Sequence, residues 1–386
     1  MFLHKKIHVI FISSLAFILG IVWGSYYSNL YALILPLSIA LLFIIAASVK
    51  AKKYIKTVLL VSCTFFAGVL NLTYQVHSHT NFLYKVDGKK FNIVATVRDI
   101  RKLKNKACPF YVLMSASKIK NTQLNNWKDI DKYICVYTRK KPNVKMGDII
   151  KAKNITIKKP KNKSYSNYLI KENIAATAFA NNLDYNILHR PKYSITRWLY
   201  HKKENILNSL EKKMSPKLFA TFSSVFLGNK NISKKEKGVL KNKFKAWGIL
   251  HILARSGLHL IIFLLICEFL LIFAPIYFYI KQLLIIILSI IYLLLSWPSI
   301  SFIRAFSVLL LYKICPFLNR KPDLVYIVTT LCVTMLIKNP IQLFFLDFQL
   351  SFLLTLTLAI YNRTQARLRR KQISQNNRVK KSPLDK

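Results

Sequence analysis

The chain has 386 residues, of which 53% are hydrophobic, and its formal net charge is +46. Few soluble domains combine that apolar fraction with that charge, whereas a multi-pass membrane protein with basic loops does. The charge is mostly lysine in a chain that is also rich in Ile and Asn. An AT-rich genome produces the same bias, so the charge alone is only a weak indication of nucleic acid or anionic lipid as a partner.

Three apolar runs open the chain, and each approaches the roughly 20 residues that a helix needs to cross a bilayer. They are Ile7–Tyr27, Tyr31–Val49 and Ile55–Tyr74. No cleavage-site pattern follows the first run, which predicts an uncleaved anchor. Lysines precede the first run and separate the second from the third, so the positive-inside rule places both clusters in the cytoplasm. Residues 1–80 are therefore predicted to form N-terminal transmembrane helices, after which the chain emerges outside.

Residues 81–190 differ in texture, with five short alternating segments that are rich in β-formers and separated by turn-prone stretches. The segments are Phe91–Val97, Phe110–Ser115, Tyr133–Thr138, Ile149–Ile157 and Ala175–Ala180. Such a series predicts a small antiparallel barrel outside the cytoplasm, with the OB-fold as the natural candidate. Only Cys108 and Cys135 share this polar region and could pair. Residues 191–216 then alternate apolar and basic side chains, which predicts an amphipathic helix in the membrane interface.

Further apolar runs follow between residues 217 and 362, and with the first three they predict about eight transmembrane helices. They are Ala246–Phe273, Gln282–Trp297, Ser299–Pro316, Leu324–Ile337 and Leu343–Tyr361. The intervening basic loops and the basic tail, residues 363–386, then lie in the cytoplasm with both termini. The lysines between residues 230 and 245 would lie outside. Either the Leu218–Leu227 run enters the membrane, or those lysines have an external partner.

One apolar run begins with a cluster of polar residues, which are rarely left idle at membrane depth. His251, Arg255 and His259 are spaced four apart and share one face of a continuous helix, with Ser256 and Gly257 between them. The cluster is either a polar stripe along an aqueous path or a packing motif in which the small residues allow two helices to approach closely.

Two other apolar runs contain charged residues. Arg304 lies in one, and Asp347 lies with Gln349 in another. Because an intramembrane charge usually has a partner, Arg304 and Asp347 are predicted to pair, either for structure alone or as part of a transport path.

No catalytic constellation, metal site or cofactor site is evident. His77 and His79 resemble the start of a metal motif, but its later ligands are missing, and no phosphate-binding G-x-x-x-x-G-K-[ST] loop occurs. The chain is therefore expected not to be an enzyme.

In this order of elements the chain resembles the ComEC family, which forms the inner-membrane channel for single-stranded DNA in bacterial competence. The specific part is an ordered series of short motifs: Phe226–Gly228, His251–His259, Ser299–Ala305, Arg320–Asp323, Asn339-Pro340 and Phe348–Phe352. Arg255 stands where the family usually has an aliphatic residue, and Trp297 where glycine is common. The chain stops soon after the last motif, whereas full-length members continue through more helices and often a metallo-β-lactamase-like domain, so a short form is expected.

The resemblance implies that the chain resides in the bacterial inner membrane and takes up single-stranded DNA during natural transformation. The implied partners are the lipid bilayer, the DNA, a second chain that supplies the missing helices, a DNA receptor, a cytoplasmic motor and further copies of the same chain. In the outer domain, Lys140 and Lys141 would contact phosphates while Tyr111, Tyr133 and Tyr137 would stack on bases, unless these tyrosines are ordinary barrel core. The competing hypotheses are a small-solute or lipid permease and a non-functional or split-gene fragment.

Overall fold

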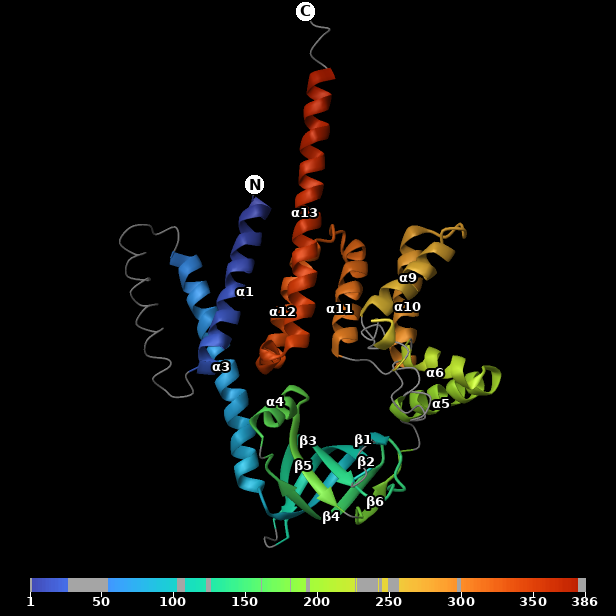
Figure 1. Cartoon of the computed structure of the whole chain (residues 1–386). Helices are drawn as coiled ribbons and strands as arrows, with labels where there is room; N and C mark the ends of the chain where they lie inside the picture. Colours follow the sequence, from blue (N-terminus) through green and yellow to red (C-terminus); the bar gives the residue numbers. More distant parts are fainter. Residues whose placement is uncertain are drawn as a thin grey trace, which may run out of the picture. The chain divides into compact units, whose positions relative to one another are not determined.

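The computed structural model describes residues 2–26, 55–102, 108–122, 126–160, 162–180, 182–191, 195–225, 227, 242, 245–248, 257–296 and 300–380. The chain divides into two compact units (Figure 1). The helical unit comprises Met1–Thr73, Leu260–Ser289 and Ile300–Lys386. The sheet unit comprises Tyr74–His259 and Ile290–Ser299.

Helices occupy every predicted apolar run that the structure describes, while Tyr31–Val49 lies outside the described residues. The long helices are α1 (Phe2–Tyr26), α3 (Ile55–Val86), α9 (Gly257–Leu270), α10 (Phe278–Leu295), α11 (Ile300–Ile314), α12 (Leu324–Lys338) and α13 (Leu346–Lys380). Two short 3-10 helices, η1 (Cys315–Leu318) and η2 (Pro340–Phe344), begin with or contain proline, which fits a tight first turn.

Within the described residues, four helical segments are long and apolar enough to cross a membrane: Val9–Tyr26, Thr57–Val86, Phe278–Leu295 and Ser301–Leu318. Helices α9 and α12 are apolar but shorter. Helix α13 continues to Lys380, well past the predicted end of its span at Tyr361. The protein is thus helical with four candidate membrane spans, and the count of eight stays a prediction.

The crossing of α1 and α3 depends on two glycines. A Cβ atom on Gly20 would lie 2.1 Å from the Phe65 carbonyl oxygen, and one on Gly68 would lie 2.3 Å from the Phe17 carbonyl oxygen. Only glycine permits backbones to approach so closely, as in small-xxx-small helix contacts. The Asn71 side chain of α3 donates hydrogen bonds to the two carbonyls at the end of α12, Leu336 and Ile337. These bonds satisfy acceptors that a helix terminus leaves open.

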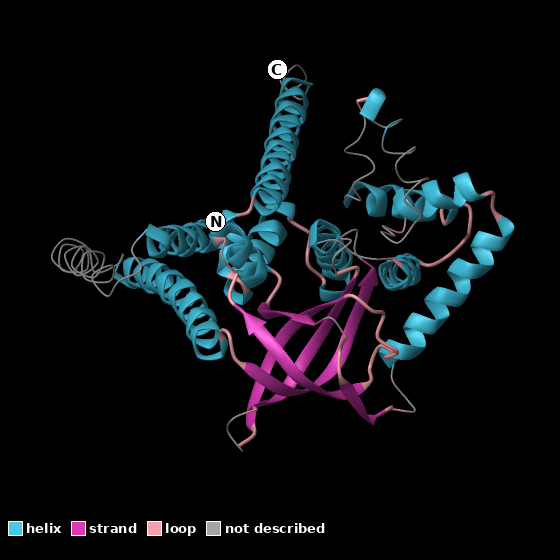
Figure 2. Ribbon diagram, turned by 60° about the horizontal axis from the view of Figure 1, so that its bottom comes forward, coloured by secondary structure: helices cyan, strands magenta, loops and turns pink. Residues whose placement is uncertain are grey.

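The sheet unit contains a six-stranded mixed sheet (Figure 2). Its strands are β1 (Lys90–Lys102), β2 (Phe110–Asn121), β3 (Lys128–Thr138), β4 (Ile149–Lys158), β5 (Ile174–Ala180) and β6 (Tyr185–His189). Their order is β1-β2-β3-β5-β4-β6, and β1 also pairs with β4. The five predicted strands are confirmed, whereas the short sixth strand was missed.

The predicted purely antiparallel arrangement is wrong at one pair, because β3 and β5 are parallel. Parallel neighbours need a long crossover, which β4 and helix α4 (Lys163–Lys171) supply here. Asn162 caps the start of α4, and its side-chain oxygen accepts a hydrogen bond from the Ser164 N–H. The crossover places α4 over the outer face of β3, where Leu169 packs on Cys135 and Ile174.

Alternation along each strand sends one set of side chains into a dry core. Val112 and Met114 of β2 and Ile134 and Val136 of β3 are completely buried there. Cys108 and Cys135 are free thiols. Helices α5 (Ile195–Lys213) and α6 (Pro216–Val225) follow the sheet, so the predicted amphipathic segment is helical.

Candidate functional site

A row of aromatic rings crosses three neighbouring strands of the sheet. Tyr111 of β2 lies opposite Tyr137 of β3, and Tyr137 lies opposite Phe179 of β5. The Tyr111 and Tyr137 rings meet edge to face with centroids 5.8 Å apart, and the Tyr137 and Phe179 rings stack at 5.2 Å. Cross-strand aromatic pairs of this kind stabilise a sheet and also present a continuous π surface.

Helix α4 extends this row by two tyrosines. The Tyr165 hydroxyl lies 3.0 Å from the Tyr137 hydroxyl, and the Tyr165 ring stacks with the Tyr168 ring at 6.2 Å. We call these five residues, Tyr111, Tyr137, Phe179, Tyr165 and Tyr168, the aromatic row. Burial, with smaller contributions from Cys135 and Tyr165, raises the pKa of Tyr137, so its phenol is neutral well above neutral pH.

The predicted DNA-binding residues fall into three groups. In the first, the Tyr111 and Tyr137 rings pack on each other and are partly buried. In the second, Tyr133 is more exposed and lies outside that ring pair. Lys140 and Lys141 are exposed in the loop that follows β3. Sequence reasoning missed Phe179 and the two α4 tyrosines. Alternation along β5 could have signalled Phe179, which ends a run of small side chains.

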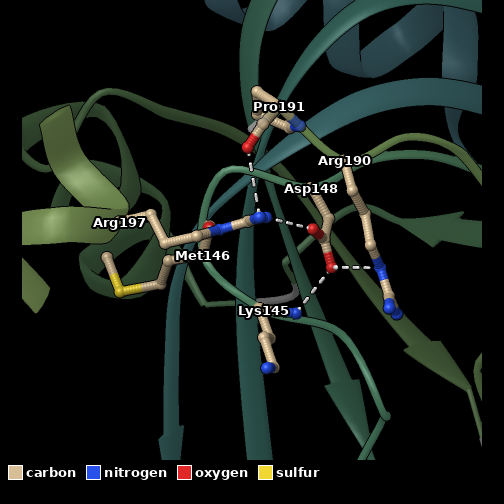
Figure 3. A network of polar contacts seen from close by, with 6 residues as sticks. All are labelled: Lys145, Met146, Asp148, Arg190, Pro191 and Arg197. Atoms are coloured by element: carbon tan, nitrogen blue, oxygen red, sulfur yellow. Dashed lines mark hydrogen bonds and ion pairs between the residues drawn. The ribbon is translucent and has the colours of Figure 1, made fainter. Parts of the chain in front are cut away.

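A buried carboxylate ties the sheet to the amphipathic helix (Figure 3). Asp148, in the turn before β4, is completely buried and forms an ion pair with Arg197 in the first turn of α5. Its other oxygen accepts the Lys145 N–H at 2.8 Å and lies 3.8 Å from the Arg190 guanidinium. Arg197 also donates to the Met146 and Pro191 carbonyls at 3.2 and 3.3 Å. The network compensates the burial of both charges and fixes how α5 leaves the sheet.

Helix α5 has a second attachment within the sheet unit. The Lys203 ammonium donates a 2.8 Å hydrogen bond to the Ser296 carbonyl, just after the last residue of α10. A cation at this position complements the negative end of the α10 helix dipole. Trp198 of the same helix is exposed, and the Lys202 ammonium lies 5.9 Å from its ring centroid. Burial and a hydrogen bond to Glu204 raise the pKa of Tyr200 on the same helix.

In the helical unit, Arg304 of α11 is 2% exposed and lies against the first turns of α13. Its Nη2 donates to the Asp347 backbone carbonyl at 2.6 Å, and its Nε donates to Ser351 Oγ at 3.2 Å. The guanidinium also lies 5.7 Å from the ring centroids of Phe348 and Phe352. Its Nη1 is buried without a hydrogen-bond partner. The predicted neighbours therefore meet, but the bond between them reaches the Asp347 backbone, whereas a pairing of side chains was expected.

The other predicted polar residues are placed as follows. Gln349 donates a 2.9 Å hydrogen bond to the Leu343 carbonyl and so closes η2. Gly257 is the first residue of α9, and His259 in the same turn is buried. His251, Arg255 and Ser256 lie outside the described residues.

Two ion pairs between helices were not predicted. Lys313 of α11 pairs with Glu268 of α9, and Arg363 of α13 lies 3.4 Å from Asp323, the residue that caps α12. Each pairing joins segments more than 30 residues apart, which no local pattern reveals. Among the described residues, no group of three or more His, Cys, Asp or Glu side chains is arranged to hold a metal ion. His79, from the weak histidine motif, is buried and bonds to the Ile174 carbonyl instead.

Residues 230–382 match the family model described as Competence protein. No curated protein and no solved structure matches the chain. The matched segment includes α9 to α13, with the buried Arg304 and the Phe348–Phe352 motif that surrounds it. The chain therefore carries, over residues 230–382, the competence-protein domain of the ComEC family.

Proposed function

We propose that this protein is an inner-membrane channel component that takes up single-stranded DNA during natural transformation. The observation that carries the proposal is the competence-protein domain at residues 230–382, in the same chain as four apolar helices long enough to cross a bilayer. The helical unit would supply the path through the membrane. The chain itself would move DNA without cleaving it.

The proposed topology has about eight spans, with both termini in the cytoplasm and the strands β1–β6 outside. The basic loops and the basic end of α13 support it, because such residues collect on the cytoplasmic side. Reporter fusions at Asn126 and after Lys371 test this arrangement. A cytoplasmic signal at Asn126 would remove the DNA-receiving role together with the topology.

We also propose that β1–β5 form an OB-like barrel that receives the DNA. The strand order β1-β2-β3-β5-β4 supports closure into a barrel, because β1 pairs with β2 on one side and with β4 on the other. The two strands at the ends of this order, β1 and β4, therefore share hydrogen bonds. Irregularities in β1 between Val94 and Ala95 and between Val97 and Asp99 increase the local twist that closure needs. OB-folds bind oligonucleotides on one face of the barrel.

Charge in the outer domain supports a nucleic-acid ligand. Between residues 81 and 190, Lys and Arg exceed Asp and Glu by 17. Each phosphate that a lysine neutralises releases condensed counterions, so affinity should fall steeply as salt rises. A single strand fits better than a duplex, because its bases can stack on exposed aromatic rings. A DNA receptor, a cytoplasmic motor, and further helices from a second chain or from other copies would complete the assembly.

The test is the transformation frequency of the host strain with the gene deleted and then restored. We expect transformants to be lost on deletion and regained on complementation, at equal growth rate. Electroporation of the same DNA, which bypasses an uptake channel, supplies the control and should be unaffected. Equal transformation of the deleted and restored strains would refute the function.

A further inference from the structure

Phe179 is an apolar ring left half exposed at the end of an otherwise buried strand. The five residues before it in β5, Ile174 to Ala178, are all buried, whereas Phe179 is 52% exposed. A single exposed phenylalanine is ordinary on a protein surface. What distinguishes this ring is its place in an ordered stack, because one side is covered by Tyr137 with the two planes only 18° apart.

Two rings of the aromatic row, Phe179 and Tyr168, are exposed, whereas Tyr111, Tyr137 and Tyr165 are partly buried. Tyr168 is 45% exposed and stacks almost parallel to Tyr165, while Tyr137 and Tyr111 are partly buried against Cys135 and Leu169. The inner rings therefore hold the outer ones in fixed orientation. A base placed on Phe179 would add one more member to an existing stack at little cost in side-chain ordering.

Cations lie next to the Phe179 end of the row. Arg139, Lys140 and Lys141 are all exposed and follow β3 directly. The last residue of β3, Thr138, lies opposite Ala180, the neighbour of Phe179. The Thr138 hydroxyl donates a 2.8 Å hydrogen bond to the Lys140 carbonyl, which fixes the start of this basic loop beside the ring.

We propose that Phe179 and Tyr168 are the base-stacking residues for single-stranded DNA, and that Arg139, Lys140 and Lys141 hold its phosphates. Tyr111, Tyr137 and Tyr165 are then the support of the site. Exposed rings together with a basic loop suit an unpaired strand, because its bases can stack and its phosphates need cations. This assignment rests on the proposed DNA-uptake function and moves the stacking role from Tyr111, Tyr133 and Tyr137 to residues that the sequence had not indicated.

The experiment uses the full chain in detergent and a fluorescein-labelled oligothymidylate, with Kd measured by anisotropy at several salt concentrations. Phe179→Leu keeps an apolar side chain but removes the π face, and Tyr168→Leu does the same at the other end. Each should weaken binding about fivefold to a hundredfold while leaving the salt slope unchanged, because stacking releases no counterions. Phe179→Trp should bind as tightly as the unaltered chain or more tightly. Lys140→Gln with Lys141→Gln should flatten the salt slope.

Tyr84→Leu is the matched control, since Tyr84 is an 83% exposed ring of the sheet unit that belongs to no part of the row. It should bind DNA as the unaltered chain does. If the unaltered chain binds and Phe179→Leu binds equally well, the stacking assignment is overturned and the DNA-uptake function stands. Heparin, a polyanion without bases, is measured in the same way. If Phe179→Leu weakens the binding of heparin as much as the binding of DNA, the ring supports the fold and does not stack on bases, which also overturns the stacking assignment. No binding by the unaltered chain at low salt would overturn the DNA-receiving role itself.

Discussion

Arg197 and Asp148 form an ion pair that joins the first turn of α5 to the turn before β4. The Asp148 carboxylate is completely buried, and each of its oxygens has a partner. This ion pair is the centre of the buried network that holds the start of α5 on the sheet, so a single substitution in it should have a large effect.

Arg197→Met should destabilise the sheet unit by about 3–5 kcal/mol, because it leaves a buried carboxylate without its counter-ion. Arg190→Met removes a guanidinium that is half exposed and 3.8 Å from the same carboxylate, so it should cost less than about 1 kcal/mol. Adding Asp148→Asn to Arg197→Met should recover part of the loss. Denaturant unfolding of each variant, followed by near-ultraviolet circular dichroism, measures the difference. Equal costs for Arg197→Met and Arg190→Met would show that the buried pair has no special role.

Gly20→Ala should disrupt the packing of α1 on α3. The added methyl group would lie 2.1 Å from a backbone oxygen, so the helices must separate, at a cost on the order of 1–3 kcal/mol. Gly24→Ala supplies the control, because its Cβ would make only ordinary contacts at 3.5 Å. The thermal stability of the detergent-solubilised chain should fall for Gly20→Ala and hold for Gly24→Ala. The same stability for both variants would mean that the backbones of α1 and α3 do not approach each other closely at Gly20.

Arg304→Met should lower the yield of folded protein more than Asp347→Asn does. The Arg304 guanidinium bonds to the Asp347 backbone carbonyl and to Ser351, and the asparagine variant keeps that carbonyl. For the same reason, exchanging the charges as Arg304→Asp with Asp347→Arg should not restore the yield. Size-exclusion profiles of the tagged chains measure it. Rescue by the exchange would show that the side chains pair after all.

Lys313→Met alone should reduce folded yield more than Lys313→Met combined with Glu268→Gln. The single change leaves the Glu268 carboxylate unpaired between apolar helices, whereas the double change removes both charges. With Glu268→Gln alone as the second single variant, the comparison is a double-mutant cycle on the same yield assay. A coupling of zero between the two positions would exclude an energetically significant pair.

The stability of the sheet unit should fall as pH rises above about 10, the ordinary pKa of tyrosine. The folded protein raises the pKa of Tyr137, so the unfolded chain loses this proton first and is favoured at alkaline pH. One such group contributes a slope of at most about 1.4 kcal/mol per pH unit. Tyr137→Phe should cost about 1 kcal/mol at neutral pH, through loss of the bond to Tyr165. It should also reduce this slope, and the remainder should come from Tyr200, whose pKa the fold raises as well. An unchanged slope in thermal unfolding from pH 9 to 11 would contradict the assignment.

Local periodicity was enough to predict most elements. Each apolar run contains a helix in the part that the structure describes, five alternating segments are strands, and the amphipathic stretch is α5. The reason is that the hydrophobic pattern of a segment records which of its faces is buried, and that information lies within about 20 residues. The ordered motifs likewise indicated the competence-protein domain that the family model locates at residues 230–382.

Only the tertiary structure decided which elements meet. The stacking of Phe179 on Tyr137 depends on the parallel pairing of β3 with β5, and Arg197 meets Asp148 across 49 residues. The close approach of Gly20 to Phe65 and the hydrogen bond from Arg304 to the Asp347 carbonyl also join helices that are distant in the sequence. Such contacts follow from the register between distant segments, which is set by global packing and loop closure and leaves no periodic trace in the chain.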